Sequence, residues 1–298
     1  MTTKRKSTKK TTAAKKKSPA KRTPRAAFAV ATNEKKTSAE RAKAFVEAPL
    51  ATIQSDTNLQ ASLNVLRDRT QPIKVRLAAL QSLQAATFSV IEFEPYREDY
   101  LATLRELVDD PDPELRQRVL GILAREKDGY TQQKLLEGLQ DPEKALVPPE
   151  KALQLLSYDV HAEAYPVARD IVNQPPNPEA KREALRLLAA DANSAPVFEK
   201  LMRDKDEDRE IRQISAASLQ AMKPKRFQEQ ARELLLDTKE YDDIQATALT
   251  ALAQFGDEKV MEKDEKLLKR VNEFGKGKST KMKKPAKAFM NKYGSDEK

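Results

Sequence analysis

One pattern recurs six times along the 298-residue chain and limits what it can fold into. Its clearest copy runs from Asp109 to Glu126, where an acidic, proline-containing turn leads into a helix that Asp112 caps and Pro113 begins. With Arg116 as the reference position, the equivalent residues along the chain are Arg76, Arg116, Pro149, Lys181, Arg212 and Gln245. They lie 40, 33, 32, 31 and 33 residues apart. Such a period is typical of a repeat array, in which each copy packs only against its neighbours.

Apolar residues stand at fixed distances after every reference residue. Seven places after it each copy has a leucine, at Leu83, Leu123, Leu156, Leu188, Leu219 and Leu252. A small or β-branched residue lies three places after it, and leucine lies four places after it in all copies but one. This spacing puts a narrow apolar stripe along one face of a helix, so we expect that helix to pack closely against its neighbours.

The apolar spacing predicts two helices in every copy. The expected pairs are 56–68 with 72–86, 95–108 with 113–126, 131–140 with 148–157, 162–173 with 178–190, 195–204 with 208–221, and 224–236 with 242–254. A further helix, 258–274, is expected to close the array, and the segment from Thr37 to Ala48, which opens with the capping box of Thr37 and Glu40, is expected to begin it.

Each turn between paired helices carries an acidic or amide residue, at Asp68, Asp109, Asp141, Asn173, Asp204 and Asp237. We expect these side chains to accept hydrogen bonds from the free amides that open the following helix, and to pair with the basic reference residue. This capping role is favoured over a catalytic one.

The acidic turn, an apolar-basic pair such as Ile211 with Arg212, and a small residue followed by leucines together resemble the HEAT repeat. The resemblance is strongest to the short bacterial repeats called PBS-lyase HEAT-like, and it covers roughly residues 55–273. It implies an all-α fold, namely a right-handed α-solenoid of about six HEAT-like helical hairpins with disordered basic tails. Pro149 and Gln245 depart from the motif because they lack the basic charge.

The chain is therefore expected to have four parts. Residues 1–36 form a disordered basic tail, 37–54 an N-terminal capping helix and linker, 55–274 the HEAT-like α-solenoid, and 275–298 a basic C-terminal tail. The first 25 residues contain nothing bulky before Phe28, so they cannot offset the entropy cost of ordering.

Charge is divided unevenly along the chain. The net charge is +9, whereas residues 1–36 carry +12 and residues 275–298 carry +6, so the residues between them carry −9. The N-terminal stretch resembles lysine-rich histone tails, and such polycations bind phosphate backbones by releasing counterions. The candidate nucleic-acid-binding residues are Lys4, Arg5, Lys6, Lys9, Lys10, Lys15, Lys16, Lys17, Lys21, Arg22 and Arg25.

The one long interval between reference residues contains an apolar insertion, residues 87–94, with Phe88, Val90, Ile91 and Phe93. Two roles are open for it. It folds down as a lid over the first two copies, which we favour, or it presents an exposed surface to a partner.

Residues for catalysis or for a metal are scarce. The chain has no cysteine, no tryptophan and a single histidine, His161, which is expected to be solvated, so catalytic triads and two-histidine metal sites are excluded. The glycines form no phosphate-binding loop. The diiron hydroxylases and DNA glycosylases among HEAT-like proteins depend on several histidines or on tryptophans. We therefore expect no cofactor, no metal and no enzymatic activity.

In HEAT-like proteins the second helices line a concave wall that binds partners. Positions two, five and nine after the reference residue point away from the apolar stripe. The candidate partner-binding residues in the middle copies are Arg118, Arg125, Lys151, Gln154, Tyr158 and Arg186. Several cations with a tyrosine could receive an acidic peptide or a phosphate chain.

The sequence thus predicts a non-enzymatic scaffold that binds a protein partner on the solenoid and uses its basic tails to bind DNA, RNA or another polyanion. Two alternatives remain: a subunit or chaperone of a lyase-type enzyme, in the manner of the bilin lyases, and a protein-protein adaptor whose tails only solubilise it. No apolar run reaches the roughly 18 residues of a membrane helix. A cytoplasmic protein is expected, with nucleoid association or a nuclear location as alternatives.

Overall fold

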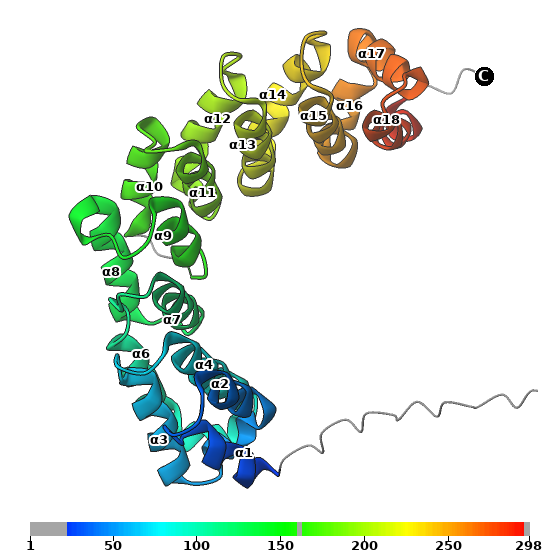
Figure 1. Ribbon diagram of the computed structural model, residues 1–298. Helices are drawn as coiled ribbons and strands as arrows, with labels where there is room; N and C mark the ends of the chain where they lie inside the picture. The colour runs from blue at the N-terminus through cyan, green and yellow to red at the C-terminus, as the bar shows by residue number, and fades with distance from the viewer. Residues whose placement is uncertain (1–22, 160–162, 295–298) are drawn as a thin grey trace, which may run out of the picture. The chain divides into compact units, whose positions relative to one another are not determined.

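The computed structural model describes residues 23–159 and 163–294. Within these ranges the regular secondary structure is entirely helical and no strand occurs, which confirms the expected all-α class (Figure 1). The chain divides into two compact units, Met1–Glu106 and Leu107–Lys298. None of the helices in the described ranges is both long and apolar enough to span a membrane.

The first unit is built from short helices that pack in pairs. Helix α2 packs against α1 and α4, and α3 packs against α4. Its elements are α1 (Pro24–Ala31), α2 (Ser38–Glu47), η1 (Pro49–Ile53), α3 (Asp56–Arg67), α4 (Ile73–Ala86), α5 (Val90–Phe93), η2 (Glu94–Tyr96) and α6 (Arg97–Arg105). The predicted capping box opens α2: the Glu40 amide donates to Thr37 Oγ1 at 3.2 Å, and the Thr37 amide donates to the Glu40 carboxylate at 3.1 Å.

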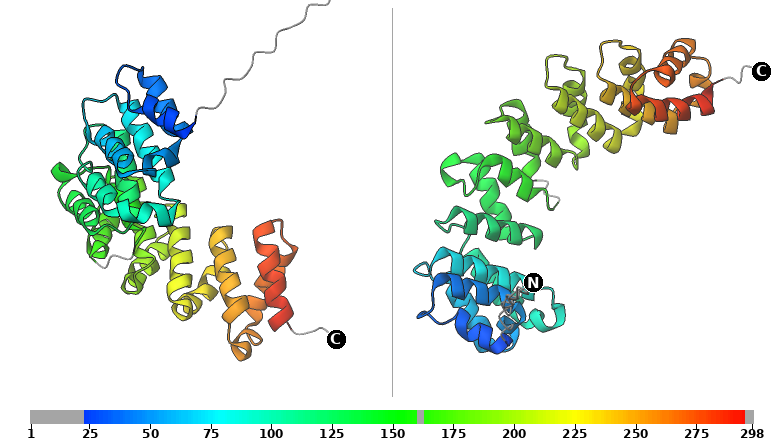
Figure 2. Two further views of the ribbon diagram at one scale, coloured as in Figure 1. Left: turned by 90° about the horizontal axis from the view of Figure 1, so that it is seen from below. Right: turned by 45° about the vertical axis from the view of Figure 1, so that its right-hand side comes forward.

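The second unit arranges its longer helices in two layers (Figures 1 and 2). Helices α7, α9, α11, α13, α15 and α18 contact one another in that order and are called the B layer, and α8, α10, α12, α14 and α17 lie on one side of it. The bounds are α7 (Pro113–Arg125), α8 (Gly129–Gln140), η3 (Pro142–Lys144), α9 (Pro149–Leu156), α10 (Ala164–Asn173), α11 (Pro178–Leu188), η4 (Ala192–Ser194), α12 (Ala195–Arg203), α13 (Arg209–Met222), α14 (Pro224–Leu236), α15 (Asp242–Phe255), α16 (Glu258–Met261), α17 (Glu265–Lys276) and α18 (Thr280–Tyr293).

Both helices of all six expected pairs are present, with ends within three residues of the predicted positions. The leucine seven places after each reference residue is no more than 2% exposed in any copy. A repeated leucine at the same depth in successive helices gives each pair the same contact with its neighbour. Five of these leucines lie in the core of the second unit, and Leu83 is buried in the core of the first.

A buried donor side chain joins the two helices of several pairs. The Nε atoms of Arg76 and Arg212 donate to the carbonyls of Leu66 and Met202, ten residues earlier, at 2.9 and 3.0 Å. Both acceptors lie in the last turn of the preceding helix, where carbonyls have no partner within the helix. Gln245 does the same with its amide, which donates to the Asp237 carbonyl at 2.8 Å.

Other reference residues make different contacts. Arg116 donates to the Asp110 carbonyl and also to the Leu146 carbonyl in the following turn, each at 2.7 Å. The Lys181 ammonium instead pairs with the Glu207 carboxylate of the next copy. A proline at position 149 has no such donor, so the third copy lacks this contact.

The turn acids act differently from expectation. Asp68, Asp141, Asp204 and Asp237 each accept a hydrogen bond from the backbone amide two residues later, at 2.9 to 3.1 Å. In the second copy Asp110 makes this contact instead of Asp109. None of the first four is the N-cap residue of the second helix of its pair, although Asp141 is the N-cap residue of the short η3 that precedes α9. The expected role at the start of the second helix is wrong for them, because a short acidic side chain is satisfied within its own turn.

Parts of both expected tails are helical, which corrects the predicted division of the chain. Residues 24–31 form α1, whose Ala27 and Ala31 are buried, and residues 280–293 form α18, which packs on α15 and α17. The apolar face of α1 consists of alanines, and the apolar face of α18 lies within a lysine-rich segment. Composition alone therefore indicated no helix at either end. Residues 1–22 lie outside the described part of the chain.

Each newly found helix completes a further pair. In the α1–α2 pair, the Arg41 Nε donates to the Ala31 carbonyl, again ten residues earlier, at 3.1 Å. In the α17–α18 pair, Met282, Ala286, Phe289 and Tyr293 are buried and the Tyr293 hydroxyl donates to the Gly256 carbonyl at 2.9 Å. The expected helix 258–274 is divided into α16 and α17, because Asp264 caps a new helix start.

We expect Leu188→Ala to lower the free energy of unfolding by about 2 to 5 kcal/mol, since it leaves a cavity in the fully buried leucine column. Chemical denaturation followed by circular dichroism measures this difference. Val260→Ala is the control, because Val260 is 57% exposed and its loss should change stability little. Equal effects of the two substitutions would contradict the packing described.

Candidate functional site

Titratable groups cluster around the α14–α15 turn. The Arg212 Nη2 lies 2.6 Å from the Glu240 carboxylate, and the Lys205 ammonium contacts both Glu240 and Asp237, the latter at 2.7 Å. The Glu240 side chain is fully buried. Tyr241 covers the cluster, with its ring 4.7 Å from the Arg209 guanidinium.

Burial alone would raise the pKa of Glu240, but hydrogen bonds from Arg212 and Lys205 outweigh it and hold that pKa below its ordinary value. The hydrogen bond from Lys205 likewise lowers the pKa of Asp237. Each of these carboxylates is thus kept ionised by a bonded cation. These four residues, Lys205, Arg212, Asp237 and Glu240, are called the turn network. Their ion pairs stabilise the turn, and the lowered pKa values of the two carboxylates result from these ion pairs and not from a role in proton transfer.

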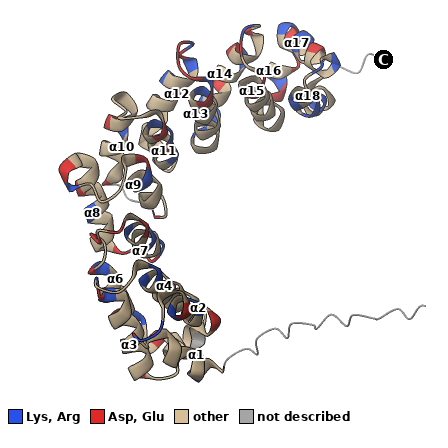
Figure 3. Cartoon of the chain, in the orientation of Figure 1, with Lys and Arg blue, Asp and Glu red and all other residues tan. Residues whose placement is uncertain are grey.

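The first candidate site is the predicted partner surface, which lies on α7, α9 and α11 and at Tyr158, just after the end of α9. A depression of about 310 Å³ brings Lys151 and Gln154 together with Gln117, Glu150, Glu179 and Glu183 of the three helices. Its cations are largely neutralised: Arg118 pairs with Glu114 at 2.7 Å, and Arg186 pairs with Glu183. Lys151 donates to Gln154 at 2.8 Å, whereas Arg125 and Tyr158 are exposed. Figure 3 shows both charges along these helices, so this surface is mixed rather than basic.

The lysines of α18 form a second candidate. Lys281, Lys283, Lys284 and Lys287 are exposed, and none forms an ion pair with any residue in the described ranges. The Lys292 ammonium, in contrast, donates to the carbonyls of Ala253 and Gln254 at 3.3 and 3.2 Å and holds the helix against α15. The four free lysines (281, 283, 284 and 287) are therefore displayed on a packed helix.

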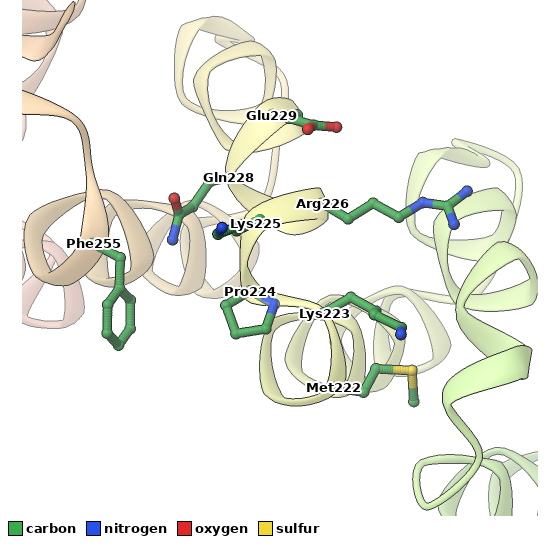
Figure 4. Close-up of a pocket in the computed structure, with 8 residues that line it drawn as sticks. All are labelled: Met222, Lys223, Pro224, Lys225, Arg226, Gln228, Glu229 and Phe255. Atoms are coloured by element: carbon green, nitrogen blue, oxygen red, sulfur yellow. The ribbon is translucent and has the colours of Figure 1, made fainter.

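A third candidate is a groove at the start of α14, called the α14 groove, with a volume of about 810 Å³ (Figure 4). The end of α13, the start of α14 and the end of α15 form it. Its lining residues are Met222, Lys223, Pro224, Lys225, Arg226, Gln228, Glu229 and Phe255.

Within the α14 groove, the Phe255 ring is 58% exposed. Arg226 is turned away toward Glu199, with Nη2 and Oε2 2.6 Å apart (Figure 4). Lys223 and Lys225 are exposed and have no ion pair among the described residues. The groove thus combines an apolar lining with two free cations, and one exposed carboxylate, Glu229, also lines it. Sequence reasoning missed it, although the run from Lys223 to Arg226 and the apolar end of α15 were visible signals.

The insertion, residues 87–94, is the fourth candidate. Phe93 is buried, with its ring edge-on to Tyr100 at 5.5 Å between centroids. Phe88 and Ile91 are each 85% exposed, and Val90 is 67% exposed. The expectation of a lid is therefore wrong for these three side chains, because only Phe93 packs inward. The alternative, an exposed surface for a partner, stays a prediction.

Some expected residues fall outside the description. The tail cations from Lys4 to Arg22 and the single histidine, His161, lie outside the described residues, whereas Arg25 is exposed on α1. The described ranges contain no group of three acidic, histidine or cysteine side chains that could hold a metal ion.

In comparisons with known proteins, no family model matches this chain, and no curated protein is significantly similar to it. The HEAT-like reading therefore depends on the residue pattern itself.

We expect the turn network to contribute stability that is lost in acid. Since the pKa of Glu240 is lower in the folded chain, its contribution is complete above the ordinary glutamate pKa of about 4.3 and disappears as the pH falls through the folded value. Glu240→Gln should lower the free energy of unfolding at pH 7 by about 3 kcal/mol and flatten its fall in acid, because Arg212 loses its counter-charge. Urea denaturation between about pH 3 and pH 7 measures both effects. The exposed Glu262→Gln is the control, and identical pH profiles for the two variants would refute the assignment.

Proposed function

We propose that this chain is a non-enzymatic scaffold, built as a HEAT-like α-solenoid, that binds nucleic acid or another polyanion through its lysine-rich ends and a protein partner through its B layer. The four free lysines of α18 carry this proposal. They are the densest group of unpaired cations on a described helix, and they project from a surface held in place by the α15 and α17 contacts. Residues 1–22 add ten Lys and Arg and no acid.

Free cations matter here because a lysine that already has a carboxylate partner gains little from a phosphate. Several other cations of the second unit are engaged in the turn network or paired within α7 and α11. A row of unpaired lysines instead displaces counterions from a phosphate backbone, and this release supplies most sequence-independent affinity. The expected ligand is therefore a polyanion recognised by charge rather than by base sequence.

The protein-binding part of the proposal has separate support. The B layer consists of the second helices of five successive copies followed by α18, and the depression across α7, α9 and α11 is lined by both acids and cations. A mixed, polar surface of this kind fits a folded protein partner with complementary charges better than it fits a polyanion.

Replacing Lys281, Lys283, Lys284 and Lys287 by Gln tests the polyanion site. We expect the affinity for a duplex of about 20 base pairs to fall at least about tenfold, and the slope of log K against log salt to decrease by about 2 to 4, because up to four phosphate contacts are lost. Fluorescence anisotropy between about 50 and 200 mM salt measures both quantities. Deleting residues 1–22 in the same assay measures the separate contribution of the N-terminal segment.

The matched control is Gln at Lys259, Lys263, Lys266 and Lys269, four exposed lysines of α16, α17 and the turn between them. It removes the same charge from the same end of the unit, so it reports the effect of net charge alone. Equal losses in the two variants, or wild-type binding that does not depend on salt, would contradict the proposal and leave a protein-protein adaptor.

A further inference from the structure

Two exposed apolar surfaces of this chain carry unpaired charges of opposite sign. One is the insertion, residues 87–94, and the other is the α14 groove. Scattered exposed apolar residues are ordinary in folded proteins, but adjacent large side chains that are mostly exposed mark an interaction surface.

The insertion is fixed on the first unit so that its apolar side chains point outward. Phe93 packs against Tyr100 on the inner side, and the Tyr96 hydroxyl donates to the Asp56 carboxylate at 2.8 Å. These contacts hold the last residue of α5 and the last residue of η2. Phe88 and Ile91 remain 85% exposed in this anchored segment.

Acidic side chains accompany the exposed apolar residues. Glu92 and Glu94 are exposed, and neither forms an ion pair with another residue of the described ranges. The insertion therefore offers an apolar cluster with two free carboxylates.

The α14 groove has the complementary chemistry. Met222, Pro224 and Phe255 provide apolar lining, and Lys223 and Lys225 provide two free cations (Figure 4). Its volume of about 810 Å³ falls in the range of clefts that hold a drug-sized ligand. The exposed Phe255 ring would be covered by an apolar occupant.

We propose that the insertion of one molecule docks in the α14 groove of a second copy of this chain. Phe88, Val90 and Ile91 cover the apolar lining, and Glu92 and Glu94 face Lys223 and Lys225. Because the two surfaces differ, the contact is heterologous: each docked pair still has one free insertion and one free groove, so association continues into open chains or closes into rings. This self-association goes beyond the scaffold function and does not depend on polyanion binding.

The full-length wild-type chain should show a mass that rises with concentration above the 33.6 kDa of one chain. A small interface of this kind is weak, so sedimentation equilibrium from about 10 µM to about 1 mM is the suitable measurement. Two variants each disable one surface: Phe88→Ser with Ile91→Ser in the insertion, and Lys223→Glu with Lys225→Glu in the groove. All four positions are exposed, so both variants should fold, and each alone should weaken association at least about tenfold.

Mixing the two variants gives the decisive result. The insertion variant keeps an intact groove and the groove variant keeps an intact insertion, so an equimolar mixture should form a complex of two chains and nothing larger. The control variant, Val260→Ser with Lys259→Glu, changes an exposed valine and an exposed lysine elsewhere and should associate like the wild type. A wild-type chain that stays monomeric throughout, variants that associate like the wild type, or a mixture that stays monomeric would each overturn the proposal.

Discussion

A buried side-chain donor that satisfies the last carbonyls of one helix, from within the next helix, is the contact that four of the described hairpins share. Arg41, Arg76 and Arg212 reach the same acceptor position ten residues earlier, and Gln245 reaches the same region with a neutral amide. A helix end that is buried without such a donor would leave carbonyls unsatisfied, at about 1 to 3 kcal/mol each. In these four hairpins the donor ties the second helix to the end of the first, and the buried leucine column is common to all six copies.

This arrangement determines which charges are available for binding. In the second unit the acids and cations of the turns are used to build the turns, as the pairing of Arg212 and Lys205 with Glu240 shows. Arg118 on α7 and Arg186 on α11 are paired along their own helices. Two groups of exposed lysines that form no ion pair among the described residues are the row on α18 and the pair at the start of α14. The α18 lysines are surrounded by solvent, whereas the lysines at the start of α14 border an apolar groove. For this reason we assign the first group to polyanion binding and the second to protein docking.

Much of the fold could be predicted because the pattern repeats. The leucine seven places after each reference residue appears in every copy, so chance resemblance is small and the helix ends follow from it. The terminal pairs were not predicted because their apolar faces do not consist of the repeated leucines. The buried face of α1 contains Ala27 and Ala31, and in α18 Met282, Ala286 and Phe289 alternate with lysines. Composition over a long window hides a face of that kind, whereas a four-residue periodicity would have revealed it.

The candidate sites were harder to predict for a different reason. Whether Arg118 is free or paired depends on the side-chain conformations of Arg118 and Glu114. The spacing of the two residues in the sequence does not determine these conformations. The α14 groove is assembled from the ends of three helices, with Met222 and Phe255 more than thirty residues apart in the chain. Only the relative placement of those helix ends creates it. The exposed part of the insertion, Phe88 to Ile91, was visible as an irregular interval, but its outward orientation depends on Phe93 taking the inward position.

The account as a whole depends on the C-terminal lysines being displayed by a packed helix and not by a tail. Amide hydrogen exchange of the free, full-length protein tests this directly, because exchange rates report local opening. The account predicts that the amides of α18 from Lys284 to Tyr293 exchange about as slowly as those of α15, against which the helix packs. Complete exchange of that segment within the first time point, with α15 still protected, would contradict it.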